Sequence, residues 1–108
     1  MVPDDQRPIP SRELNRIFEH NVRILSRDRV NGRLVAAARA LLGLDQIQFA
    51  EKAGIRRQTL ADLEGGARRP QARIRDAVLT SLDESGVVFI EAGGRVGPMI
   101  DPGLIDKS

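Results

Sequence analysis

The chain has 108 residues, which is enough for one domain with a modest hydrophobic core. It contains no cysteine, which excludes a disulfide framework and a thiolate metal site. No apolar run is long enough for a membrane span or a signal peptide, so we expect a soluble, cytoplasmic protein. The formal net charge is only +2, but residues 32–80 hold nine cations and five anions. A polyanion would therefore meet this middle segment first.

The first 28 residues divide into two predicted parts. Residues 1–10 contain three prolines and no hydrophobic periodicity, which predicts a flexible arm. In residues 11–28, a cap at Ser11 and apolar side chains on one helical face predict an N-terminal amphipathic helix. Those apolar side chains are Leu14, Ile17, Phe18, Val22 and Leu25.

Residues 29–86 are predicted to form the main helical part of the chain. Four helices are expected there, each ended by a glycine that can adopt a left-handed conformation. The helices span residues 33–42, 46–53, 57–64 and about 71–84, and the glycines are Gly43, Gly54, Gly65 with Gly66, and Gly86. Asp45 is a good cap for the second helix, whereas Arg56 stands at the cap of the third. The expected fold is all-α (mainly), a compact bundle of about five helices.

The pattern changes in residues 87–108, where the run VVFIE from Val87 to Glu91 predicts a short C-terminal β-strand. A strand needs a partner for its backbone groups. One possibility is a hairpin with residues 95–100, although Pro98 limits that pairing, and the other is a second copy across a two-fold axis. Because both faces of the strand are apolar, pairing between two copies is the preferred interpretation. The dimer interface would then include Val87, Val88, Phe89 and Ile90.

The stretch FAEKAGIRRQTL, residues 49–60, places two short helices on either side of Gly54. Ala50 leaves room for the second helix to cross the first, and Gly54 permits the positive φ of the turn. If Leu60 and Leu63 point to the core, the opposite side of the helix faces outward. The outward positions are then Arg57, Gln58, Ala61 and Asp62. A helix start of this composition suits the DNA major groove, where arginine can pair with guanine and glutamine with adenine.

The segment LGLDQIQFAEKAGIRRQTLADLEGGARRP resembles the helix-turn-helix of Cro and lambda-repressor (XRE) type proteins, as in a small single-domain bacterial member. The resemblance covers residues 32 to about 82. The matching positions are Arg39, Leu42, Gly43, Leu44, Gln46, Ala50, Gly54, Ile55, Leu60, Leu63, Glu64 and Gly66. The resemblance implies that the bundle contains a helix-turn-helix whose second helix reads DNA.

The same resemblance implies roles for individual residues. The base-reading residues would be Arg57, Gln58 and Asp62. Gln46 would contact a phosphate. Further phosphate-binding candidates, proposed from their positions near the helix and not from the resemblance, are Arg56, Thr59, Arg68, Arg69 and Arg73. A structural salt bridge is expected between Arg39 and Glu64. Arg56 stands where the family usually has a serine or threonine cap, so the start of the helix loses about 1 kcal/mol of stabilisation by capping. Asp62 is also unusual, because DNA phosphates repel a carboxylate. It would either accept a hydrogen bond from a cytosine amine or lie too far from the bases to contact them.

These features predict a sequence-specific double-stranded DNA-binding transcriptional regulator. It would act as a repressor that binds an inverted repeat as a homodimer, with half-sites about 34 Å apart. No cofactor, metal, membrane or small-molecule ligand is expected. The alternative is a protein-binding regulator, an antitoxin or antiactivator, that acts through the N-terminal helix or the strand edge. An enzyme is not expected, because no nucleophile, base and orienting group can be assembled and His20 is the only histidine.

Overall fold

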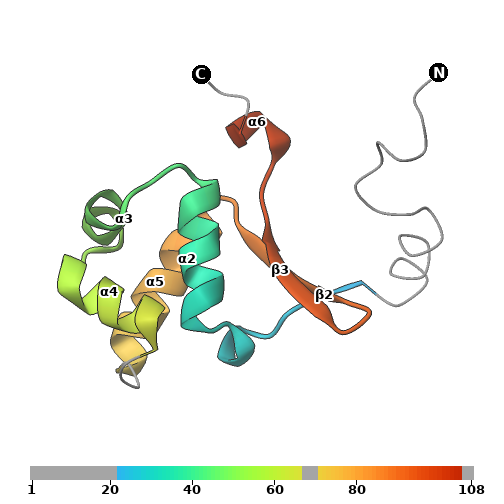
Figure 1. Cartoon of the computed structure of the whole chain (residues 1–108), viewed down its shortest axis with the longest axis horizontal. Helices are drawn as coiled ribbons and strands as arrows, with labels where there is room; N and C mark the ends of the chain where they lie inside the picture. Colours follow the sequence, from blue (N-terminus) through green and yellow to red (C-terminus); the bar gives the residue numbers. More distant parts are fainter. Residues whose placement is uncertain (1–21, 67–70, 106–108) are drawn as a thin grey trace.

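A computed structural model of the chain describes residues 22–66 and 71–105. The elements in chain order are β1 (Arg23–Ile24), the 3₁₀ helix η2 (Arg27–Arg29), α2 (Gly32–Leu41), α3 (Gln46–Ala53), α4 (Arg57–Gly65), α5 (Ala72–Glu84), β2 (Val88–Ala92), β3 (Arg95–Met99) and α6 (Pro102–Ile105). The described part is mainly helical, as predicted, with one small antiparallel sheet. Figure 1 shows α3 and α4 on one side of α2 and α5, and the sheet on the other.

The helices from α2 to α5 lie where the sequence places them. Gly54 and Gly66 are left-handed C-caps of α3 and α4, with φ values of 74° and 68°, and Gly43, with a φ of 73°, follows the Leu42 cap of α2. Asp45 forms a reciprocal capping box with Gln48, in which each side chain accepts from the other residue's backbone N–H. These boundaries were predictable because each depends on residues that are close in sequence.

The sheet corrects the preferred interpretation of the C-terminal strand. Its order is β1-β2-β3, and β2 is the central strand with both edges paired inside the chain. The turn of the β2–β3 hairpin uses Gly93 and Gly94, which have φ values of 58° and 77°. Pro98 is accommodated because β3 is an edge strand. Pairing of β2 with its own copy is therefore wrong, and the hairpin that was the second choice is correct.

The prediction of an N-terminal helix over residues 11–28 is wrong where the structure describes it, and residues 1–21 lie outside the described residues. Arg23 and Ile24 form β1, and the Leu25 N–H donates to the Phe89 carbonyl at 2.9 Å. Leu25 is buried in the core. Pairing with a strand more than sixty residues away thus overrides the local helical spacing.

One hydrophobic core joins the helices to the inner face of the sheet. Its largest fully buried side chains are Phe49, Leu60, Leu82, Val35, Val78 and Val87. This burial also corrects the predicted dimer interface, because Val87 and Phe89 are only 2% and 7% exposed within their own chain. Val88 remains exposed and Ile90 half-buried on the other side of β2. A contact between copies cannot use Val87 and Phe89 without opening the core.

Candidate nucleic-acid interface

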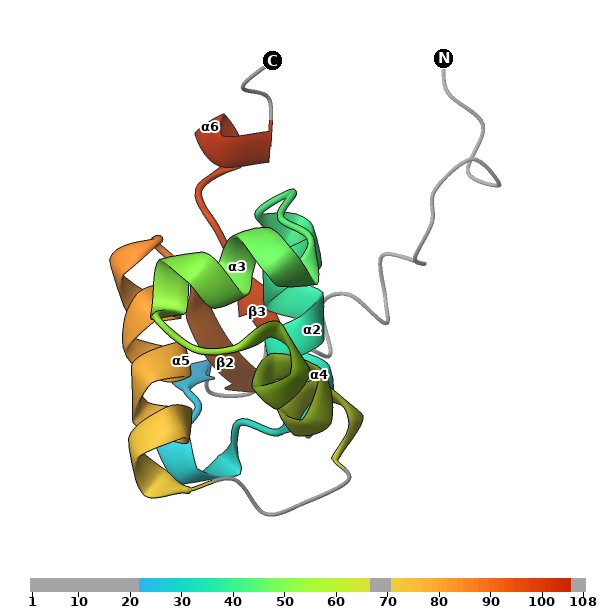
Figure 2. The same ribbon diagram turned by 90° about the vertical axis from the view of Figure 1, so that its left-hand side faces the viewer.

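Helix α4 presents one polar side to solvent and buries the other. Leu60 and Leu63 are buried in the core and fix the rotation of the helix. The three predicted base-reading residues, Arg57, Gln58 and Asp62, are all exposed. Figure 2 shows α3 and α4 on the near side of the molecule and the sheet behind them. The outward side of α4 is therefore free to meet a large partner.

The turn before α4 sets how the helix starts. Gly54 ends α3 with a positive φ, and the Ile55 N–H returns to the Ala50 carbonyl at 3.0 Å. Ala50 is buried at this crossing, as expected for a small residue between two short helices. The N-cap of α4 is Arg56, which gives no side-chain cap hydrogen bond. The first N–H groups of α4 thus have no side-chain acceptor of the usual kind and can take an anionic oxygen.

A recess of about 460 Å³ lies beside the start of α4, between the turn and α5. Its lining residues are Gly54, Ile55, Arg56, Thr59, Arg73, Ile74 and Ala77. Three of the predicted phosphate-binding residues, Arg56, Thr59 and Arg73, therefore line one hollow, although Arg73 comes from a different helix. Two others, Arg68 and Arg69, lie outside the described residues. The recess could not be predicted from the sequence, because it depends on how α5 packs beside the turn.

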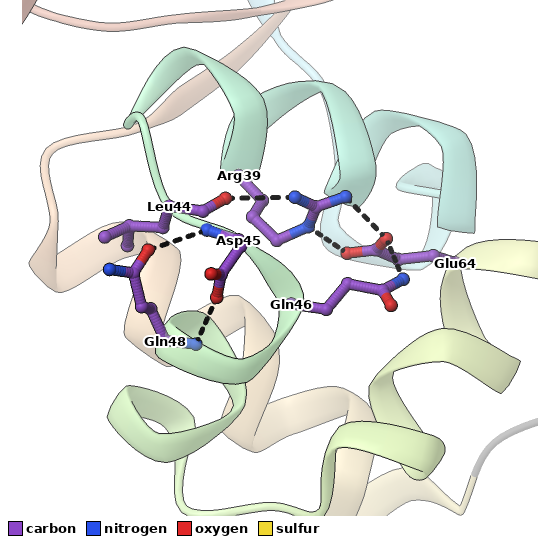
Figure 3. Close-up of polar contacts among 6 residues, drawn as sticks. All are labelled: Arg39, Leu44, Asp45, Gln46, Gln48 and Glu64. Carbon is purple, nitrogen blue, oxygen red and sulfur yellow. Dashed lines mark hydrogen bonds and ion pairs between the residues drawn. The ribbon is translucent and has the colours of Figure 1, made fainter.

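A polar network joins α2, α3 and α4 under this surface (Figure 3). Arg39 donates two hydrogen bonds to the Glu64 carboxylate, from Nε at 2.7 Å and from Nη2 at 3.0 Å. It donates a third, at 2.9 Å, to the Leu44 carbonyl. Gln46 Nε2 adds a hydrogen bond of 3.0 Å to Glu64 Oε1. The predicted salt bridge is present, and the hydrogen bonds that Arg39 donates to the Glu64 carboxylate raise the pKa of the guanidinium.

Residues 35–74, less than half of the chain, match the family model described as Helix-turn-helix. This segment is a Cro/C1-type (XRE-family) helix-turn-helix. Its first helix is α3 and its second helix is α4. Domains of this family bind DNA in transcription regulators. A search of curated proteins finds no match to the chain.

Several arginines near the helix-turn-helix are occupied in holding the fold together. Arg27 forms ion pairs with Asp76 at 2.9 Å and Asp83 at 2.8 Å, both on α5. Arg75 donates to the Val30 carbonyl at 2.7 Å and also to the Arg27 carbonyl. These contacts fasten the segment before α2 onto α5. The sequence does not reveal them, because the partners lie more than forty residues apart.

Residues 22–66 and 71–105 lack the features of two other kinds of site. No helix there is long and apolar enough to cross a membrane. No group of three or more potential metal-ligating side chains comes together within those ranges either.

Proposed function

We propose that the protein is a sequence-specific double-stranded DNA-binding transcriptional regulator that inserts α4 into the major groove. The observation that carries this proposal is the polarity of α4 itself. Arg57, Gln58 and Asp62 lie on its exposed side, while Leu60 and Leu63 anchor its other side in the core. Arginine and glutamine can each make two hydrogen bonds to a base edge, which is the chemistry of direct readout.

The recess beside α4 supports a second part of this proposal, contact with the DNA backbone. Arg56, Thr59 and Arg73 line it, and together they would contact phosphates next to the bases that α4 reads. Gln46 already gives one Nε2 hydrogen to Glu64, so its second Nε2 hydrogen remains for a phosphate oxygen. These contacts would position the helix without choosing a sequence.

The proposed regulator binds an inverted repeat as a homodimer and represses by occluding the DNA. Two recognition helices related by a two-fold axis would enter successive major grooves about 34 Å apart. Repression by occlusion is favoured over activation, because it requires nothing beyond DNA binding, the one activity that the described surface supports.

Selection of bound fragments from random duplex DNA tests the proposal directly. Enrichment of an inverted repeat with half-site centres one helical turn apart is expected. The affinity for that repeat should fall steeply with salt, with a slope of about −0.9 per contacted phosphate. Failure to bind any duplex at low ionic strength would overturn the proposal.

The alternative function is a protein-binding antitoxin or antiactivator. The sheet does not support the version of it in which a partner binds to a free strand edge. β2 is paired on both sides, β1 is only two residues long and β3 contains Pro98, so no long edge is open to an added strand. Its other form, through the segment before β1, concerns residues outside the described ranges. If removal of residues 1–21 abolishes regulation in cells but leaves DNA affinity unchanged, that segment recruits a protein.

A further inference from the structure

One face of the sheet carries an exposed apolar side chain on each of its three strands, whereas Ala92 at the other end of the same face is buried. The register places Ile24 opposite Ile90, and Val88 opposite Met99, on the side away from buried Phe89. Ile24, Val88 and Met99 are 74%, 44% and 53% exposed. We call this surface the outer sheet face; by register it comprises Ile24, Val88, Ile90, Ala92, Arg95, Gly97 and Met99. Isolated exposed apolar residues are common, but neighbours on one flat face mark an interaction site.

We propose that the outer sheet face contacts a second copy of this chain, so that two molecules pack face to face. This inference rests on the proposed function, in which two copies occupy one inverted repeat. The face carries a single charged side chain, Arg95, next to the hairpin turn and at the end away from Met99. A surface with one peripheral charge can meet an identical surface without placing like charges at the centre.

The position of the face suits two molecules that bind DNA at the same time. The sheet lies on the opposite side of α2 and α5 from α3 and α4, as both ribbon views show (Figures 1 and 2). Contact through the sheet therefore leaves the outward side of α4 uncovered in both copies. It also needs no added strand, which the short β1 and the proline of β3 would not support.

A recess next to the face supplies a specific contact. It has a volume of about 250 Å³, and its lining is mainly apolar, with Ile24, Val88, Leu79 and Phe89, and also includes the ion pair of Arg27 and Asp83. Met99 projects from the same face, and its flexible unbranched side chain suits a recess of irregular shape. A two-fold axis would repeat this contact, so that each Met99 enters the other copy's recess.

The small size of the face distinguishes a second copy from an unrelated protein. It offers far fewer residues than the roughly 20 to 30 per side of a standard interface, so association in free solution should be weak. Two copies on neighbouring half-sites, however, are held at an effective concentration in the millimolar range. A weak contact is sufficient under that condition, whereas a partner without a DNA tether would need a larger one.

The test uses the full chain and substitutions on the two faces of the same sheet. Met99→Glu and Ile24→Glu place a carboxylate on the outer sheet face. Val96→Glu is the matched control, because Val96 is 45% exposed on β3 but lies on the other face, opposite Glu91. Sedimentation equilibrium up to about 1 mM should show weak self-association for the wild type and for Val96→Glu, with loss of at least tenfold for the other two.

Intermolecular contacts can be observed directly with a mixture of isotopically labelled and unlabelled protein. NMR contacts between copies that involve the Met99 and Ile24 methyl groups would support the proposal. A wild type that stays monomeric at about 1 mM, or equal effects of all three substitutions, would overturn it. Methyl contacts made only within one chain, to residues before Val22, would also overturn it by identifying a different occupant.

DNA-binding measurements complete the test. On a duplex with two half-sites, Met99→Glu should lose about 100-fold in cooperative affinity, while its affinity for one half-site stays unchanged. Loss of single-site binding in Met99→Glu would contradict the assignment of this face. If the wild type binds no DNA at all, the proposed function fails, and the sedimentation and NMR results still decide whether the copies associate.

Discussion

Gln58 Nε2 donates a hydrogen bond of 3.0 Å to Asp62 Oδ1 on the exposed side of α4. The bond fixes the glutamine amide so that Oε1 and one Nε2 hydrogen remain free, the acceptor and donor that an adenine edge requires. In the proposed complex, it would also give the Asp62 carboxylate a donor beside the negatively charged DNA. We therefore interpret Asp62 as a residue that positions Gln58, in preference to the cytosine contact considered from the sequence.

Substitutions of Asp62 distinguish these two roles. Asp62→Asn keeps an acceptor for Gln58 and removes a negative charge, so it should preserve the base preference and increase affinity. Asp62→Ala removes the acceptor and should weaken discrimination at the base under Gln58 by about 1.5-fold to twofold, since an exposed pair of this kind is worth a few tenths of a kcal/mol. Competition between duplexes that differ at one base pair measures both. A changed preference at a C·G position, with the adenine position unaffected, would favour direct reading by Asp62.

Arg57 and Arg73 should differ in the way their loss affects binding. Arg57→Ala is expected to cost about 1 to 3 kcal/mol and to relax preference at one base pair. Arg73→Ala should weaken binding to all duplexes alike and reduce the salt slope by about one. Arg95→Ala on a single half-site is the control, because it removes the same charge from an exposed position on the sheet. Equal, sequence-independent losses for Arg57 and Arg73 would rule out the reading role of Arg57.

Gly32 allows α2 to approach the end of α4 more closely than any other residue would. A Cβ at this position would lie 2.1 Å from the Leu63 carbonyl oxygen and 2.8 Å from that of Glu64. Backbone atoms cannot move aside cheaply, so Gly32→Ala should lower the free energy of unfolding by about 1 to 3 kcal/mol.

Gly65 is the matched control for that substitution. It is also helical, but a Cβ there would meet no atom within 4 Å. Gly65→Ala should be neutral or stabilise the protein by up to about 1 kcal/mol, because alanine has the better helix propensity. Urea unfolding of both variants measures the difference. Equal stabilities would show that α2 and α4 can separate without cost.

The sequence predicts well those parts of the fold that depend on residues within one or two helical turns of each other. Gly54 needs only a left-handed conformation at the end of a short helix, and Asp45 needs only the amide three residues later. The outward position of Arg57 follows from the same local logic, since Leu60 and Leu63 fix the rotation of α4.

The parts that sequence misses are set by distant partners. The spacing of Val22 and Leu25 suits a helix, yet β1 forms because Arg23 pairs with Glu91 and Leu25 reaches the core beside Phe89. The same reason explains why the sequence predicted the strand of residues 87–91 but placed the hairpin with β3 second and missed the pairing with β1. Near the start of α4, the recess lined by Arg73 forms only when α5 packs beside the turn, and no local pattern specifies that packing.

The ion pair between Arg39 and Glu64 should contribute strongly to the position of α4. Its side chains are 18% and 6% exposed, and Glu64 also accepts from Gln46. Glu64→Ala leaves the guanidinium and the amide without their acceptor, so a loss of about 2 to 3 kcal/mol is expected, reduced from the fully buried case because Arg39 is partly solvated. The double variant Arg39→Met with Glu64→Leu should cost less than Glu64→Ala alone. Urea unfolding measures the two losses of stability. A larger loss in the double variant than in Glu64→Ala would mean that water solvates the unpaired Arg39 guanidinium.

Glu91 should make the stability of the folded protein depend on pH. Hydrogen bonds from Arg29, and then from Arg23, hold the pKa of the Glu91 carboxyl below its ordinary value of 4.5. A folded-state pKa lower than the unfolded one stabilises the protein above the unfolded value, and this contribution disappears as the pH falls through the folded value. Glu91→Gln should therefore be less stable than the wild type at neutral pH and equally stable in acid.

Two measurements check this expectation for Glu91. An NMR titration of its carboxyl carbon should give a midpoint below 4.5. Urea unfolding at a series of pH values should show the difference between wild type and Glu91→Gln shrinking as the pH falls below that range. Glu84→Gln serves as control, because Glu84 is exposed at the end of α5 and is outside the ion pairs that the structure describes. If both variants show the same pH dependence, Arg23 and Arg29 do not fasten β1 through Glu91, and the burial of Leu25 would be left as the main force holding that strand.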